Sequence, residues 1–334
     1  MGIRRAAPVA VTVAAVLIAA AGCGKSSSNN NGGGNAGSGD LSGKTVQLIV
    51  GVKDDPFYIT MVCGAQAEAQ KQGVKFSSNG SAMWDVSQQR PIIDSVAATK
   101  PAGLLISPVD TDALSPDLKQ MQSAGTKVVL VDTTVTDASV GVSRISSDNE
   151  SGGKTAADAL AKEMGDKGSA IVISVKPGVS TTDARIKGFE AQVKAAHPGI
   201  TLLPVQYDND DPAKAAQIVQ ATIAAHPDLG GVFADNVKTA EGVAAGVNQA
   251  GKKGAIKISA FDAGPQQVQD LQNGTVQVLI AQDPASIGAQ GVQQAVAAIQ
   301  GKPVQGSIGT TLVAITAQNM SDPNVSKYFY KGSC

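Results

Sequence analysis

Short apolar runs alternate with longer amphipathic runs along most of the chain. The short runs have the length of a strand, are rich in β-branched residues, and most end in Asp, Ser, Pro or Gly. They include residues 45–52, 102–108, 126–132, 169–175, 230–235, 255–262 and 276–283. The longer runs are rich in Ala, Gln and Lys, as in residues 61–73, 150–165, 183–199 and 212–228. This alternation predicts an α/β fold of parallel, doubly wound sheets with helices on both faces.

The number of strand-like runs and the length of the chain indicate more than one sheet. At least nine such runs are present in the 334 residues, which is many for one doubly wound sheet. We therefore expect two lobes, each with its own core.

Polar residues follow many of the strand-like runs at their carboxyl ends. In an open α/β sheet the ligand site lies beyond this edge, so these residues are candidate ligand contacts. They are Asp54, Asp55, Ser107 to Asp110, Asp132, Asp235, Asn236, Asp262, Gln282 and Asp283. Each alone also fits a helix N-cap, because Asp, Ser and Asn are preferred caps at strand-to-helix turns. The whole set, with Phe57 and Tyr58 beside Asp55, favours a ligand cleft formed by both halves of the chain.

The N-terminal residues are typical of an exported protein. Arg4 and Arg5 precede an apolar stretch that ends at Cys23, which is short for a membrane span and typical of a signal peptide. The sequence "AAGC" at 20–23 resembles a bacterial lipobox, although that pattern prefers Leu at Ala20. We expect residues 1–22 to be removed, Cys23 to carry lipid, and the Gly/Ser/Asn-rich residues 23–41 to form a flexible tether. Cleavage elsewhere, with release of a soluble protein, is the alternative; both place the folded part outside the cytoplasm.

Two further cysteines, Cys63 and Cys334, remain after Cys23 is set aside. In an oxidising compartment they form either one disulfide, which ties the C-terminus to the first helix, or two free buried thiols. No CxxC motif is present, so the sequence does not indicate a zinc or redox site.

Charge and motifs argue against nucleic-acid binding and against most enzyme classes. The formal net charge of −1 provides no basic excess for a nucleic acid. His197 and His226 each follow an Ala-rich segment and precede Pro, as in an ordinary helix stop, which leaves no His for a catalytic triad or a metal site. The GxGxxG match at 32–37 lies in the tether, without a strand before it or a helix after it. The paired acids Asp54 and Asp55 leave glycoside hydrolysis as the remaining enzymatic interpretation.

A set of motifs resembles one known family. In order, the chain contains "DDPFY", "GLLISPVDTDAL", "KVVLVD", "SSDNESGGKTAADAL", "TTDARIKGF", "GVFADNVKTAEGV", "ISAFDAGP" and "VLIAQDPASIGAQGV". Over residues 45–318 this set resembles the type I periplasmic sugar-binding proteins of ABC transporters, the ribose-binding group, whose ligand core is shared with lactose-repressor-like regulators. A lipid signal precedes Thr45 and no helix-turn-helix segment does, which favours the transport branch.

The resemblance implies two lobes joined by a three-strand hinge. We place the crossings near Ser147, Asp283 and Leu312. The expected N-terminal lobe comprises residues 42–147 plus 283–311, and the expected C-terminal lobe comprises 148–282 plus 312–334.

The resemblance also implies a set of ligand contacts. Phe57 and Tyr58 match rings that stack on the faces of a sugar. The residues that match or lie at the polar contact positions are Asp55, Asp132, Thr133, Asp183, Asp210, Asn236, Asp262 and Gln282. A carboxylate suits such a position because it accepts hydrogen bonds from two adjacent hydroxyls. Trp84 matches no motif position, so we expect it in the core, with a place at the cleft rim as the alternative.

Departures from the family pattern bear on the ligand. Thr133 and Asp183 stand where the ribose-type pattern has arginines, Arg185 matches a structural arginine, and a further ring of the pattern falls near Asp210. We therefore expect a pocket without guanidinium donors and rich in carboxylates. That pocket suits a small neutral polyhydroxy compound, a pentose or an open-chain polyol, with a cationic ligand as the second choice.

Together these inferences predict a solute-binding lipoprotein rather than an enzyme. It would be a monomer without cofactor or metal, held at the outer face of the cell membrane only through lipid on Cys23, and would deliver its ligand to an ABC permease. A receptor that presents ligand to a sensor kinase or chemoreceptor is the alternative, and a carboxylate-pair glycosidase is a third interpretation.

Overall fold

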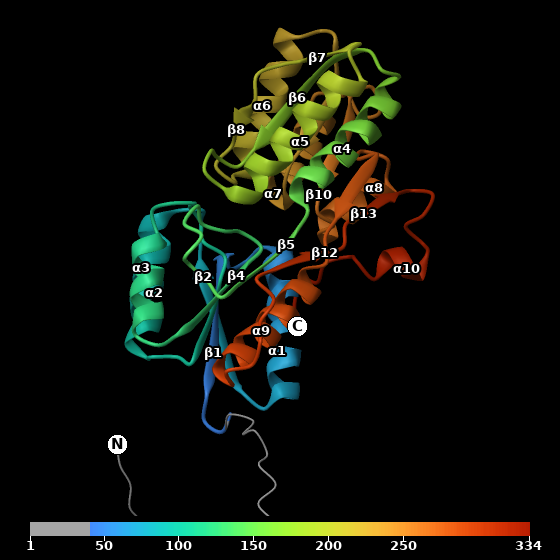
Figure 1. Cartoon of the computed structure of the whole chain (residues 1–334). Helices are drawn as coiled ribbons and strands as arrows, with labels where there is room; N and C mark the ends of the chain where they lie inside the picture. The colour runs from blue at the N-terminus through green and yellow to red at the C-terminus, as the bar shows by residue number, and fades with distance from the viewer. Residues whose placement is uncertain (1–40) are drawn as a thin grey trace, which may run out of the picture. The chain divides into compact units, whose positions relative to one another are not determined.

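The computed structural model describes residues 41–334 (Figure 1). The predicted signal peptide, the predicted lipidation site Cys23 and the predicted tether up to residue 40 lie outside the described residues. Among residues 41–334, no helix is both long enough and apolar enough to cross a membrane.

The first sheet has six strands in the order β12-β5-β4-β3-β1-β2, and all its pairs are parallel. Its strands are β1 (Thr45–Val52), β2 (Lys75–Ser81), β3 (Gly103–Ile106), β4 (Lys127–Val131), β5 (Ser143–Ser147) and β12 (Ser307–Thr310). The central strand β3 is buried at every position, as expected for a parallel strand covered on both faces.

The second sheet has seven strands in the order β13-β11-β10-β9-β6-β7, with β8 also paired to β6. Its strands are β6 (Gly168–Ser174), β7 (Ile200–Leu202), β8 (Gln206–Tyr207), β9 (Leu229–Ala234), β10 (Lys257–Phe261), β11 (Val278–Ala281) and β13 (Val313–Thr316). Within residues 41–334, β11–β13 is the only antiparallel pair of this sheet, and its other pairs are parallel.

Helices cover both faces of each sheet (Figure 1). Around the first sheet lie α1 (Pro56–Gln72), α2 (Val86–Ala98), α3 (Ser115–Ser123) and α9 (Pro284–Ile299). Around the second lie α4 (Asn149–Met164), α5 (Ser180–Ala196), α6 (Pro212–Ala225), α7 (Val237–Gln249) and α8 (Pro265–Gln272). The short α10 (Pro323–Ser326) follows β13. Helices α1 and α9 pack closely because Gly64 and Gly288 lack side chains; a Cβ on either would come within 2.1 Å of a backbone oxygen of the other helix.

The chain passes between the two sheets at three places. It leaves the first sheet between Ser147 and α4, returns between Ala281 and α9, and leaves again between β12 and β13. The predicted fold class, two doubly wound parallel sheets with three crossings, is confirmed. Cys63 of α1 and Cys334 form a disulfide, with their Cα atoms 5.4 Å apart.

Candidate ligand-binding site

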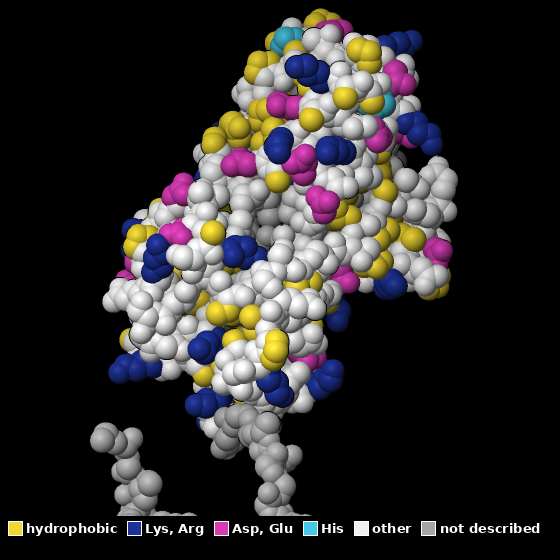
Figure 2. All heavy atoms as spheres, in the orientation of Figure 1, with side chains coloured by type: hydrophobic (Ala, Val, Ile, Leu, Met, Phe, Trp, Pro, Cys, Tyr) yellow, Lys and Arg dark blue, Asp and Glu magenta, His cyan; other side chains and the backbone are white. Residues whose placement is uncertain are grey.

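A pocket lies where the carboxyl ends of strands from both sheets meet. From the first sheet it is lined by residues that follow β1, β2 and β4, and from the second by residues that follow β6, β9, β10 and β11 or lie on α5. The lining residues are Asp55, Phe57, Tyr58, Trp84, Asp132, Val175, Thr181, Thr182, Arg185, Asn236, Asp262 and Gln282. The cavity between them measures about 30 Å³. Over the visible surface, charged side chains of both signs are scattered (Figure 2).

The turn between β1 and α1 orients the first group of lining residues. Asp55 is the N-cap of α1, and its Oδ1 accepts a hydrogen bond from the backbone N–H of Phe57 at 2.7 Å. Pro56 occupies the first helical position, where its missing N–H costs nothing. The next two residues are therefore held in the first turn of the helix, so the rings of Phe57 and Tyr58 face the pocket and pack edge to face at 5.1 Å. Asp54 is exposed and does not line the pocket.

Tyr58 and Trp84 form one wall of the pocket over the end of β1. Their ring centroids are 6.1 Å apart, and the Tyr58 hydroxyl donates to Asp132 Oδ2 at 2.6 Å. Both rings lie against Gly51, where a Cβ would come 2.8 Å from Tyr58 Oη and 2.9 Å from Trp84 Cη2. Trp84 therefore lies at the pocket, while it also packs on the hydrophobic core.

Asp132 and Asp262 end β4 and β10 with left-handed backbone conformations, at φ values of 64° and 78°. Asp tolerates this region better than most residues. Neither is the N-cap of a helix, although the carboxylate of Asp262 also accepts a hydrogen bond from the backbone N–H of Val237 at the start of α7. Asp262 Oδ1 accepts from Gln282 Nε2 at 2.8 Å and from the Tyr330 hydroxyl at 2.9 Å.

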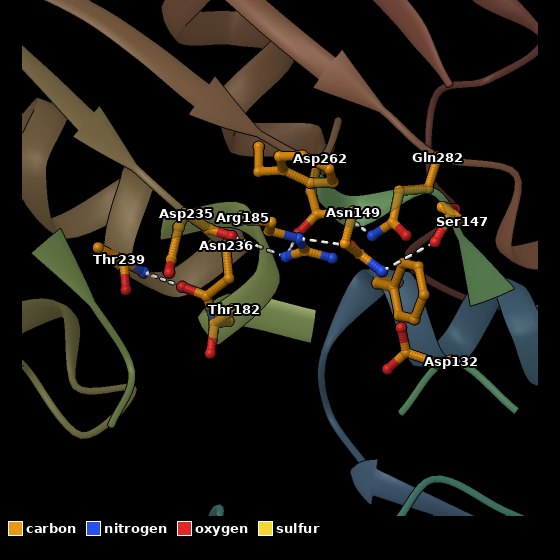
Figure 3. Close-up of polar contacts among 12 residues, drawn as sticks. Asp132, Ser147, Asn149, Thr182, Arg185, Asp235, Asn236, Thr239, Asp262 and Gln282 are labelled. Carbon is orange, nitrogen blue, oxygen red and sulfur yellow. Dashed lines mark hydrogen bonds and ion pairs between the residues drawn. The ribbon is translucent and has the colours of Figure 1, made fainter. Parts of the chain in front are cut away.

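Arg185 brings a guanidinium into the pocket, which corrects the expectation of a pocket without one. Its Nε donates to Asn149 Oδ1 at 2.8 Å and its Nη1 to the backbone oxygen of Asp235 at 2.7 Å (Figure 3). The guanidinium carbon lies 3.8 Å from the ring centroid of Phe261, and Nη1 is 4.0 Å from Asp262 Oδ2. The arginine is buried, and these contacts fix its plane at the edge of the pocket.

Helical spacing explains why Arg185 lies in the pocket and the predicted Asp183 does not. Thr181 and Thr182 precede Arg185 by four and three residues, so the three side chains share one face of α5. Asp183 lies two residues before Arg185 and is turned to the opposite face. It is exposed and accepts a hydrogen bond from the backbone N–H of Gly178 at 3.0 Å.

Two other predicted residues also lie outside the pocket lining. Thr133 is buried and donates to the backbone oxygen of Pro108 at 2.8 Å. Asp210 lies behind Asn236, from whose side-chain amide it accepts a hydrogen bond at 2.6 Å, and it pairs with Lys238 at 3.2 Å. The remaining predicted contacts come together: Asp55, Phe57, Tyr58, Asp132, Asn236, Asp262 and Gln282. Sequence reasoning missed three lining residues on α5: Thr181, Thr182 and Arg185. Helical spacing could have linked them only after one of the three was known to lie in the pocket.

Burial raises the pKa of the carboxyl groups in the pocket. The pKa of Asp132 rises to about 6, chiefly through desolvation, while the hydrogen bond from Tyr58 and the charge of Arg185 oppose the rise. The pKa of Asp55 rises through desolvation and then through the charges of Asp210 and Asp262 on the other sheet. Carboxylates of the two sheets therefore face each other across the pocket and repel when both are ionised.

One acceptor in the pocket has no partner. Gln282 donates to Asp262 through Nε2, but its buried Oε1 accepts no hydrogen bond from any residue in the described part of the chain. Because buried polar atoms are nearly always paired, Oε1 is an acceptor available to a ligand donor.

Comparison with known proteins identifies the family. Residues 46–303 match the family described as periplasmic binding protein domain. The chain belongs to this family of periplasmic binding proteins. The family that the motifs indicated is thus confirmed.

Relatives of this periplasmic binding protein are sugar-binding proteins. It is 33% identical to the ribose import binding protein of Escherichia coli over 82% of this chain and 91% of that protein. A solved ABC transporter solute binding protein from Agrobacterium vitis, bound with α-D-tagatopyranose, is 42% identical, with a TM-score of 0.84 over 86% of this chain and 99% of that one. A carbohydrate transporter solute binding protein from Agrobacterium radiobacter, in complex with D-arabinose, is 28% identical, with a TM-score of 0.83 over 87% and 100%.

Proposed function

We propose that this periplasmic binding protein captures a neutral monosaccharide or related polyol between its two sheets and delivers it to an ABC permease. One observation carries the proposal. The rings of Phe57, Tyr58 and Trp84 line the same pocket as the unpartnered Gln282 Oε1 and the carboxylates of Asp132 and Asp262. Apolar ring faces beside hydroxyl acceptors suit a sugar, whose C–H faces and hydroxyl edges need both.

The balance of charge in the pocket favours a neutral ligand. Three carboxylates line it, and the one guanidinium, that of Arg185, already donates to Asn149 and to a backbone oxygen. A sugar acid or phosphate would place a further negative charge beside them, in a site with no second arginine or lysine in its lining. The pentose and ketohexose in the two solved relatives are neutral sugars, which supports the same class here.

Closure of two lobes on the ligand provides the transport signal in this proposal. We assign residues 42–147 with 283–311 to one lobe, and 148–282 with 312–334 to the other. Ligand hydroxyl donors between Asp55 and the facing Asp262 offset the repulsion of these two carboxylates, so ligand favours the closed arrangement. Outside the pocket the lobes also touch, since the backbone N–H of Thr134 donates to Ser180 Oγ at 2.9 Å.

Lipid on Cys23 would keep the protein beside its permease. The lipobox-like residues 20–23 and the Gly/Ser/Asn-rich stretch that follows support this part of the proposal. A tethered binding protein reaches a membrane partner at a high effective concentration.

A ligand panel tests the proposed function. Thermal unfolding is followed with D-tagatose, D-arabinose, D-ribose, D-galacturonate and ribose 5-phosphate, and positive results are confirmed by calorimetry. We expect at least one neutral sugar to raise the melting temperature, because a ligand at about 100 times its Kd stabilises the native state by about 2.7 kcal/mol. A preference for the sugar acid or the phosphate, or no shift with any neutral sugar, would contradict the proposal.

A further inference from the structure

The C-terminal residues 327–334, here called the C-terminal strap, are fastened to α1. Cys334 is joined to Cys63 of this helix by the disulfide. Before it, the backbone N–H of Lys331 donates to Thr60 Oγ1 of the same helix at 2.7 Å. The strap therefore ends on the helix whose first turn carries Phe57 and Tyr58.

Tyr330 connects the strap to pocket residues of both sheets. Its backbone N–H donates to the oxygen of Ala263 at 3.0 Å. Its hydroxyl donates to Asp262 Oδ1 at 2.9 Å and accepts from the backbone N–H of Gln282 at 3.0 Å. The edge of its ring meets Phe57, with ring centroids 5.8 Å apart. The side chain is buried, so these contacts are shielded from water.

The strap is a further passage of the chain between the two sheets. It follows β13 and α10 on the side of the second sheet and returns to α1, which packs on β1 and β2 of the first. Unlike the three crossings near Ser147, Ala281 and Thr310, it is closed by a covalent bond between side chains. It also lies beyond residue 303, where the match to the family ends.

We propose that the C-terminal strap positions the sugar pocket, with Tyr330 orienting Asp262, Gln282 and Phe57 and the Cys63–Cys334 disulfide holding Tyr330 in place. The proposal rests on the proposed function. Tyr330 and the Gln282 amide both donate to Asp262 Oδ1, which leaves Asp262 Oδ2 turned toward Arg185. This arrangement places Asp262 Oδ2 beside Arg185 at the pocket and leaves Gln282 Oε1 as an unpartnered acceptor for a ligand hydroxyl. Tyr330 is therefore a positioning residue, acting through its neighbours.

The disulfide matters for affinity because chain ends fray when nothing holds them. Without the bond, the strap is held only by non-covalent contacts, namely the hydrogen bonds of Tyr330 and Lys331 and the packing of the Tyr330 ring on Phe57, and ordering it becomes part of the cost of binding sugar. A redox change at Cys63 and Cys334 thus alters the affinity of a pocket that neither cysteine lines.

Calorimetric titration with D-tagatose tests the strap on four oxidised proteins: wild type, Y330F, Y328F and the double variant C63S/C334S. Y330F removes the hydroxyl and its two buried hydrogen bonds, with Asp262 and with the Gln282 N–H, but keeps the ring on Phe57. We expect it to weaken binding about tenfold, because Asp262 and Gln282 are then less firmly oriented. Y328F is the matched control, two residues away and outside the pocket lining, and should bind like wild type. C63S/C334S should bind D-tagatose several-fold more weakly than wild type. Dithiothreitol should weaken sugar binding by wild type to the same extent and leave the affinity of C63S/C334S unchanged.

The outcomes separate the strap from the proposed function. If the wild-type protein binds none of the panel sugars, both the proposed function and this inference are refuted. Wild type that binds while Y330F retains full affinity overturns the positioning role, even if C63S/C334S is too unstable to measure. Equal affinity of oxidised and reduced wild type overturns the part assigned to the disulfide.

Discussion

Replacement of Gly51 by Ala tests whether the wall formed by Tyr58 and Trp84 belongs to the ligand site. The added Cβ would lie 2.8 Å from Tyr58 Oη and 2.9 Å from Trp84 Cη2. Ordinary carbon contacts are about 3.5–4.0 Å, so each ring must retreat by about 0.5–1 Å. A shift of that size lengthens the 2.6 Å hydrogen bond from Tyr58 to Asp132 to the limit of a useful bond.

The magnitude follows from the cost of overpacking. Extra atoms in a well-packed site cost about 1–3 kcal/mol, and 1.4 kcal/mol corresponds to a tenfold change in Kd. We therefore expect G51A to bind D-tagatose about tenfold or more weakly than wild type by calorimetry. Trp84 is the single tryptophan of the chain, so its emission spectrum should also differ between G51A and wild type.

A second glycine provides the control. Gly309 lies in β12, and a Cβ there would meet no heavy atom within 4 Å. G309A should change the free energy of unfolding by about 0.5 kcal/mol or less and leave Kd unchanged. If G51A bound sugar as tightly as G309A, the two rings over Gly51 would not belong to the ligand wall.

Two further predictions concern the pocket carboxylates. D55A should abolish ligand-induced stabilisation, and loss of the N-cap should lower the free energy of unfolding by about 1 kcal/mol. D54A changes an exposed residue and should leave the thermal shift intact. The reverse pattern would show that the acid in the pocket is Asp54. The pKa of Asp132 is raised from 3.8 to about 6, so the folded state binds more protons than the unfolded state between these values, and this group lowers stability as pH rises through them. As the carboxyl group of Asp132 ionises, it becomes a better hydrogen-bond acceptor for sugar hydroxyls. The affinity of wild type for sugar should therefore rise between pH 5 and about 7. D132N should show weaker binding with a flatter pH profile by calorimetry, and a wild-type profile that falls with pH would contradict the assignment.

Patterns local to the chain were sufficient for the fold and for part of the site. Strand-like runs of β-branched residues and the helical segments between them predicted parallel sheets, because burial on both faces leaves a continuous apolar run. Asp55 was among the residues that fit a helix N-cap, and Phe57 and Tyr58 beside it marked the same turn as a candidate ligand contact. In the structure Asp55, Phe57 and Tyr58 all line the pocket.

Other parts of the site depend on contacts that sequence position does not reveal. Asp183 and Arg185 are two residues apart, yet the rotation of α5 turns one to solvent and the other into the pocket. Trp84 lines the pocket because strand pairing puts the end of β2 beside the end of β1, where the ring lies against Gly51.

The contacts of Tyr330 could be recognised only in the folded protein. Tyr330 is 48 residues from Gln282 and 68 from Asp262 along the chain, and it hydrogen-bonds both. No local period or motif links such positions, because the strap reaches them only after the second sheet has formed and the chain has turned back to α1. Local patterns were enough to predict the fold class, the N-cap candidate Asp55 with two rings beside it, and the pair of cysteines. The tertiary structure decided which polar side chains meet in the pocket, because packing of α5 and the strap against the strand ends sets those distances.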